Sequence, residues 1–150
     1  MIQQAHLQLQ EYWAKSSSSV AASRSSESAV KDLEERYGVK LPDDFRLYLL
    51  ESSPEPNNLD ESCTYWWPLA EIKNIPDEYK HDLHNAEVAV EAASYLFFAD
   101  YMVWCWAWAI CCKPGKNFGH IVQVGTGEIE VARSFSEFVS AYIKGRSDLF

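Results

Sequence analysis

The most apolar stretch of the chain is residues 95–112, which carry a single charge, at Asp100. Its second half alternates, with Trp104, Trp106 and Trp108 on one face and the small residues Cys105, Ala107 and Ala109 on the other. A period of two is typical of a strand whose successive side chains point to opposite faces. The pattern predicts two buried strands joined by a turn at Asp100-Tyr101-Met102: Tyr95–Ala99 and Val103–Cys111.

The charge inside this run argues against a membrane span. About 20 apolar residues would cross a bilayer, but an ionised carboxylate there costs roughly 2.5–3.5 kcal/mol on insertion scales. The strand-like alternation also differs from the pattern of a spanning helix. We therefore expect a buried sheet, no membrane contact, and an Asp100 that caps its turn rather than acting as an acid or base.

Helical spacing of apolar residues predicts four helices. The first carries Ile2, Leu9 and Trp13, and the second ends at Gly38. The third is opened by Pro42, and the last is opened by the capping box Ser134-x-x-Glu137. Residues 16–28 include eight serines, which favour an internal loop between the first two helices.

Shorter strands complete the expected sheet, and residues 70–92 are expected to form a short helix or turn followed by irregular chain. The predicted strands are Cys63–Leu69, His120–Val124 and Glu128–Ala132, the last two joined in a hairpin at Gly125-Thr126-Gly127. Helices first, an antiparallel sheet in the middle and one closing C-terminal helix define an α+β fold. We expect residues 1–150 to form one domain.

The net charge of −9 is concentrated in the middle of the chain. Residues 43–91 hold twelve acids and three bases, whereas the two flanking segments are each balanced. Such a field repels nucleic acid and anionic membranes and favours a basic partner. The alternative is a solvated face that only keeps the protein soluble.

Candidate chemistry is sparse. His81-x-x-His84 could present two metal ligands on one helix face, but no third ligand is identifiable, so we expect neither a metal nor another cofactor. The four cysteines form no C-x-x-C motif and are expected to be reduced, as in the cytoplasm. No nucleophile–base pair is recognisable, and no catalytic residue is expected.

Several motifs, taken together in their order along the chain, resemble those of the SUKH superfamily, the Smi/Knr-like domain of yeast cell-wall regulators and many bacterial proteins. They are Glu35-x-x-Gly38-x-x-Leu41-Pro42-x-x-Phe45-x-x-Tyr48-Leu49, Trp67-x-Leu69-x-x-Ile72, Phe97–Asp100 and Ser134-Phe135-x-x-Phe138. The chain departs from that pattern in having Tyr101-Met102 where family members often carry glycines in the turn.

The resemblance implies a single-domain α+β protein, and for bacterial members an immunity role in which the protein neutralises a toxin, frequently a nuclease. A regulatory scaffold domain is the alternative, and a small-ligand binder with an aromatic pocket around Trp66, Trp104 and Trp108 ranks last. The expected partner is a basic protein toxin, met by a monomer or a weak homodimer.

The loop 55–61 and the segment 77–82 are acid-rich and flanked by turn formers, so we expect both on the surface, in one acidic face. Tyr65 or Trp66 is expected near its rim as an anchor. The candidate partner-binding residues are Glu55, Asp60, Glu61, Tyr65, Trp66, Asp77, Glu78 and Asp82.

Overall fold

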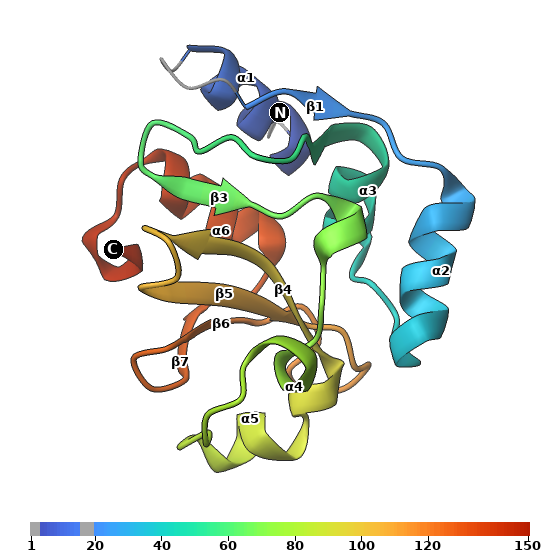
Figure 1. Ribbon diagram of the computed structural model, residues 1–150, viewed down its shortest axis with the longest axis vertical. Coiled ribbons are helices and arrows are strands. Elements are labelled where there is room, and N and C mark those ends of the chain that lie inside the picture. Colours follow the sequence, from blue (N-terminus) through green and yellow to red (C-terminus); the bar gives the residue numbers. More distant parts are fainter. Residues whose placement is uncertain (1–3, 16–19) are drawn as a thin grey trace.

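The computed structural model describes residues 4–15 and 20–150 and has the expected α+β architecture (Figure 1). The helices are α1 (Ala5–Lys15), α2 (Glu27–Tyr37), α3 (Asp43–Ser52), α4 (Ile75–Glu78), α5 (Ala86–Val90) and α6 (Phe135–Ile143). Short 3-10 turns, η1 to η3, lie at Leu69–Glu71, Ala92–Ser94 and Ser147–Leu149. The main sheet has the order β3-β4-β5-β6-β7, and every neighbouring pair is antiparallel. Its strands are β3 (Thr64–Trp66), β4 (Tyr95–Tyr101), β5 (Trp106–Cys111), β6 (Ile121–Val124) and β7 (Ile129–Ala132).

The apolar run forms the two central strands, as expected, but its turn lies later in the sequence. Tyr101 pairs with Trp106, so β4 includes Asp100 and the turn occupies residues 102–105. Trp108 lies fully inside the core, whereas Trp104 stands in the turn and not on the strand. The prediction that Trp104, Trp106 and Trp108 share one face of a strand is therefore wrong for Trp104.

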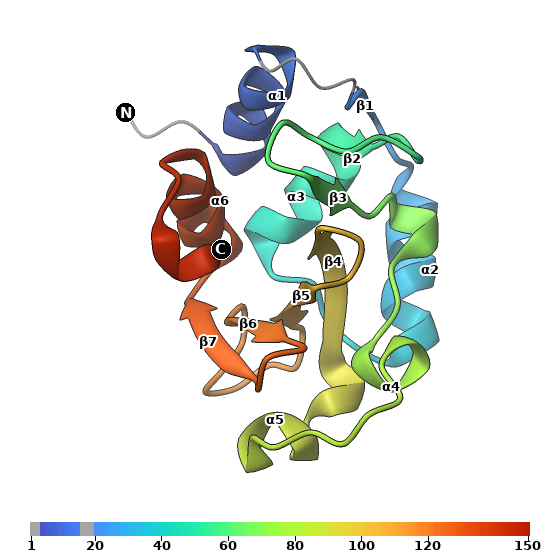
Figure 2. The ribbon, with the colours of Figure 1, turned by 60° about the vertical axis from the view of Figure 1, so that its left-hand side comes forward.

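Helices α1, α3 and α6 cover one side of the sheet, and α4 and α5 lie on the other (Figure 2). The side that α1, α3 and α6 cover holds an aromatic core, in which Phe138 of α6 packs edge-on against Trp66, Phe98 and Trp108. Trp13 of α1 meets Trp66 with ring centroids 5.7 Å apart. Trp66, Phe98, Trp108 and Phe138 are all buried in this layer, and large aromatic side chains contribute strongly to the stability of a core.

The helix boundaries follow from local sequence. Ser26 accepts from the backbone N–H of Ala29 at the start of α2, and Gly38 ends that helix with φ of 62°. Ser134 caps α6 in the same way through Glu137 N–H. Phe45, Tyr48 and Leu49 form the expected buried stripe of α3. Ile2 and the four serines at 16–19 lie outside the described residues.

The rest of the serine-rich segment is not a plain loop. β1 (Ala22–Ser23) pairs antiparallel with β2 (Ser53–Pro54), and α2 already begins at Glu27. This two-stranded ribbon places the chain after residue 20 alongside the end of α3. The predicted strand Cys63–Leu69 is likewise shorter, because its pairing with β4 covers only Thr64–Trp66.

Residues 70–92 contain two short helices joined by extended chain. Asn74 and Asn85 cap α4 and α5, accepting from the N–H groups of Asp77 and Val88 at 2.9 and 3.2 Å. The linking chain is held by the buried Glu128, whose Oε1 accepts from His84 N–H at 2.6 Å and Asn85 N–H at 2.7 Å. Across residues 4–15 and 20–150, no helix has the length and apolar character to cross a membrane.

Candidate protein-binding surface

Asp60 was expected on the surface, but it is a buried structural group with 4% of its area exposed. Its Oδ1 accepts from the backbone N–H groups of Ser62 and Thr64 at 2.9 and 3.0 Å. Its Oδ2 accepts from Trp66 Nε1 at 2.9 Å and from the hydroxyl of Tyr142. Burial and the adjacent Asp60 charge raise the pKa of Tyr142, so the phenol stays a donor. This carboxylate therefore ties the loop before β3 to α6.

Trp66 is also not at a rim. It is 1% exposed, and its ring meets Tyr142 edge-on with centroids 5.1 Å apart. Trp108 lies in the same buried layer, while Trp104 packs elsewhere, on Tyr79 and Phe97. The three tryptophans therefore do not line the single aromatic pocket that the small-ligand hypothesis required.

Tyr65 is the half-buried member of β3 and lies at the surface. Its hydroxyl donates to Glu71 Oε1 at 2.7 Å and accepts from Asn57 N–H at 3.5 Å. Burial, with the Glu71 hydrogen bond second, raises the Tyr65 pKa to about 12. Glu55, in the loop before it, is exposed.

Asp77 and Glu78 lie side by side on α4 but have different partners. Asp77 is exposed and accepts from the hydroxyl of Tyr37 at 2.8 Å. Glu78 is partly buried, pairs with Lys73 at 3.6 Å and accepts from Trp104 Nε1 at 3.0 Å. Only Asp77 thus presents its carboxylate mainly to solvent.

Asp82 is exposed in the extended chain after α4, between His81 and His84. The two histidines are not on a helix, so the helix-face arrangement that would make them ligands is absent. Within residues 4–15 and 20–150, no three His, Cys, Asp or Glu side chains are grouped so as to hold a metal ion.

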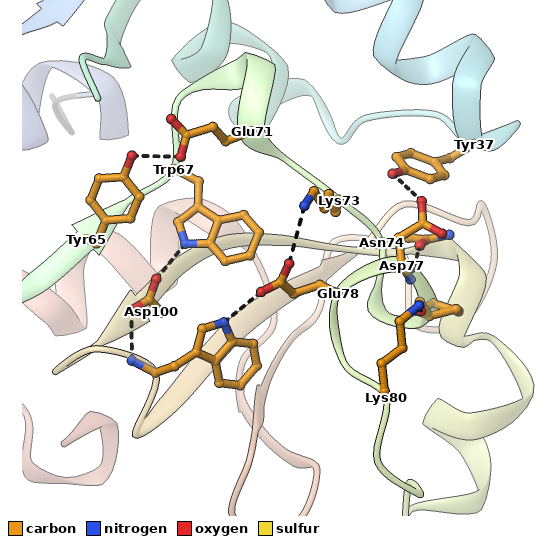
Figure 3. A network of polar contacts seen from close by, with 12 residues as sticks. Tyr37, Tyr65, Trp67, Glu71, Lys73, Asn74, Asp77, Glu78, Lys80 and Asp100 are labelled. Carbon is orange, nitrogen blue, oxygen red and sulfur yellow. Dashed lines mark hydrogen bonds and ion pairs between the residues drawn. The ribbon is translucent and has the colours of Figure 1, made fainter. Parts of the chain in front are cut away.

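The two acid-rich segments lie on different sides of an edge strand. Loop 55–61 lies on one side of β3 and residues 77–82 lie on the other (Figure 1). Tyr65 of β3 is hydrogen-bonded to Glu71 (Figure 3). The two segments are called the acidic flanks below.

Between these flanks, Asp100 organises the end of the β4–β5 hairpin (Figure 3). Its Oδ1 accepts from the backbone N–H of Trp104 at 3.1 Å, as expected for a residue that caps a turn. Its Oδ2 accepts from Trp67 Nε1 at 2.7 Å. Burial raises the pKa of Asp100, and the two hydrogen bonds oppose that rise.

The turn that Asp100 holds has an unusual backbone. Met102, Val103 and Trp104 all lie in the left-handed region, with φ of 46°, 53° and 66°. Such conformations cost a non-glycine residue on the order of 1–3 kcal/mol, and β-branched residues such as valine are outliers there. The contacts around the turn hold this conformation. In the sequence, it is indicated by a tight turn between two strands that contains no glycine.

Beside the turn lies an open groove of about 840 Å³. One wall comes from residues 78–82 and His84, and the other from Trp104, Cys105 and Gly125. Gly125 brings the β6–β7 hairpin close, since a Cβ at this position would lie 3.2 Å from Trp106 Cα. The groove offers polar side chains and a concave surface to a partner.

Four of the candidate acids remain available to a partner. Residues 55–82 hold seven carboxylates and two lysines, and within the described part of the chain Glu78–Lys73 is the one ion pair that uses any of these acids. The exposed candidates outside ion pairs are Glu55, Glu61, Asp77 and Asp82.

The comparisons with known proteins agree with the architecture. A model of the SMI1/KNR4 family (SUKH-1) matches residues 24–141, which include the whole sheet and most of α6. Helix α1 precedes the matched range, although Trp13 packs into the same core. No curated protein matches the chain.

Proposed function

Because this chain belongs to the SMI1/KNR4 family (SUKH-1), we propose that it acts through a protein partner, as an immunity protein that binds and neutralises a cognate toxin. The observation that carries this proposal is the set of exposed carboxylates at Glu55, Glu61, Asp77 and Asp82, which no lysine or arginine of the described chain neutralises. Unpaired surface charges of one sign are available for pairing across an interface.

The charge indicates the chemistry of the partner. A nuclease toxin needs a basic surface to hold phosphate groups, and an inhibitor that presents carboxylates competes for that surface. Opposite net charges also accelerate the encounter, and salt weakens this acceleration. We therefore propose a basic toxin, with nuclease as the activity that fits best.

The proposal requires no catalytic step and no cofactor, because neutralisation follows from occupying the toxin. It places the protein in the cytoplasm, where a nuclease would reach its substrate. The four free cysteines suit a reducing compartment, and burial raises the pKa of the Cys111 and Cys112 thiols and keeps them unreactive.

The test requires a basic toxin domain, and a candidate is any such domain that is encoded beside the gene for this chain. The domain is induced in bacteria alone and together with the chain, and the association rate of the purified pair is measured at about 50 and about 200 mM salt. We expect growth to be restored by the chain and association to slow at the higher salt. A wild-type chain that neither protects nor binds would refute the proposal.

A charge-reversed pair of variants identifies the acids responsible. Glu61→Lys with Asp82→Lys changes one exposed acid on each flank and should slow association about tenfold at low salt. The matched control, Asp32→Lys with Glu35→Lys, makes the same change in charge at two exposed acids of α2 that belong to neither flank. Equal effects of the two double variants would mean that only net charge matters.

A further inference from the structure

Exposed apolar side chains gather at one end of the sheet. Leu59, Met102, Val103 and Ile129 are four of the seven large hydrophobic residues that are exposed in the described chain. Strand pairing places them at the same end, with Leu59 beside edge strand β3, Ile129 on the opposite edge strand β7, and Met102 and Val103 in the β4–β5 hairpin between them (Figure 1). Val103 is the most exposed of the seven, at 87%. Met102 and Val103 are adjacent and both exposed, so they form one apolar projection, and exposed apolar groups that lie together mark interaction sites.

Met102 and Val103, called the hairpin tip below, are exposed but firmly held. Met102 N–H donates to Cys63 O at 3.0 Å, and Cys105 N–H donates to Tyr101 O at 2.9 Å. The next residue, Trp104, stacks on Tyr79 with centroids 5.6 Å apart and an interplanar angle of 13°. A fixed apolar projection loses little conformational freedom on binding, which favours affinity.

Acidic groups stand on both sides of the hairpin tip. On one side, Cys63, which accepts from Met102, follows the exposed Glu61 by two residues. On the other side, Asp82 and Glu78 share the groove wall that faces Trp104 and Cys105. An apolar centre with a charged periphery is the usual arrangement of a protein interface, in which central side chains dominate the affinity.

We propose that the hairpin tip is the central anchor of the toxin complex and inserts into an apolar depression on the toxin that basic side chains surround. This inference rests on the proposed function and adds the position of the contact. The acidic flanks select a basic protein over nucleic acid or an anionic membrane. In this arrangement the flanks set the rate of encounter, and the tip sets the lifetime of the complex.

The experiment compares Val103→Asp with Val90→Asp, using the toxin domain that the wild-type chain binds. Val90 on α5 is a matched control, because it is the same residue type with 83% exposure. A purely electrostatic surface would bind a basic toxin no more weakly after gaining an acid. We expect instead that Val103→Asp raises Kd by about 10- to 100-fold, mainly through faster dissociation, and that Val90→Asp changes Kd less than about twofold.

Val103→Gly is a second variant that removes the side chain without disturbing the fold, since glycine adopts the observed backbone readily. It should bind at least about fivefold more weakly while unfolding no more easily than the wild type. Wild-type binding by both variants would overturn the anchor and leave the immunity function intact. Failure of the wild-type chain to bind the toxin would overturn both. If Val103→Asp only dissociates a homodimer, as sedimentation would show, the tip is a self-association surface and the toxin contact is wrong.

Discussion

The indole N–H of Trp104 donates to the carboxylate of Glu78 at 3.0 Å, joining the β4–β5 turn to helix α4 across 26 positions of sequence. Glu78 is therefore partly committed to the internal structure. Replacing Glu78 would remove the hydrogen bond that holds the Trp104 side chain and would also remove a surface charge. Substitutions at Glu78 consequently change two properties at once, and Asp82 is the better residue for testing charge alone.

Relief of backbone strain gives the first prediction. Val103→Gly should increase the free energy of unfolding by about 0.5–1 kcal/mol. A left-handed conformation costs an L-residue roughly 1–2 kcal/mol, and glycine gives back roughly 0.5–1 kcal/mol through unfolded-state entropy. Urea denaturation measures the change. Val90→Gly, in the last turn of α5, should destabilise the protein; an equal loss at both sites would show that the turn is unstrained.

Asp60 and Glu61 are neighbours that should respond in opposite ways. Asp60→Asn should lower the free energy of unfolding by about 3 kcal/mol, because four donors converge on the carboxylate and an amide would turn N–H groups toward some of them. Glu61→Gln, on an exposed side chain, should leave the melting temperature unchanged. Thermal unfolding of both variants checks this, and a stable Asp60→Asn protein would contradict the buried assignment.

The raised pKa of Asp100 predicts a pH dependence. An acid whose pKa is higher in the folded than in the unfolded state binds more protons when folded, so its contribution to stability falls as pH rises between the two pKa values. Asp100→Asn lacks this titration. It should be less stable than the wild type by about 1–3 kcal/mol, since Trp67 and Trp104 N–H both need acceptors.

The gap between the wild type and Asp100→Asn should therefore be wider near pH 4 than at pH 7. Denaturant unfolding at the two pH values measures it, and the other titrating groups cancel in the difference. A gap that widens toward pH 7 would mean that the hydrogen bonds, and not burial, dominate the Asp100 pKa.

Glu128 should control the order of one groove wall. Glu128→Ala removes the acceptor of His84 and Asn85 N–H, so hydrogen exchange in residues 84–88 should accelerate while the core strands stay protected. Glu130→Ala is the control, because Glu130 is exposed and pairs with His120 at 2.5 Å. Unchanged exchange at residues 84 and 85 in the Glu128 variant would refute the anchoring role.

Local patterns predicted the main helices, the two long strands and the family resemblance. The helix signals at Gly38 and Ser134 and the alternation through Trp106 and Trp108 depend on residues within a few positions of each other. Backbone hydrogen bonding and side-chain periodicity act at that range, so the sequence predicts them. The α+β order and the resemblance to the SUKH superfamily followed from those elements.

Tertiary structure decided which polar residues are structural. Asp60 and Glu61 are adjacent acids. Asp60 is the buried one, and it contacts Tyr142, which lies 82 positions away in the sequence. The conformation of the hairpin tip likewise depends on distant residues. Cys63 accepts from Met102 N–H, Trp67 donates to Asp100, and Glu78 accepts from the Trp104 indole. These contacts stabilise left-handed conformations that residues 102–104 would avoid on their own. The sequence by itself determined where apolar segments begin and end. Long-range packing decided which carboxylates reach solvent and where the apolar anchor projects, since burial depends on partners that local sequence does not contain.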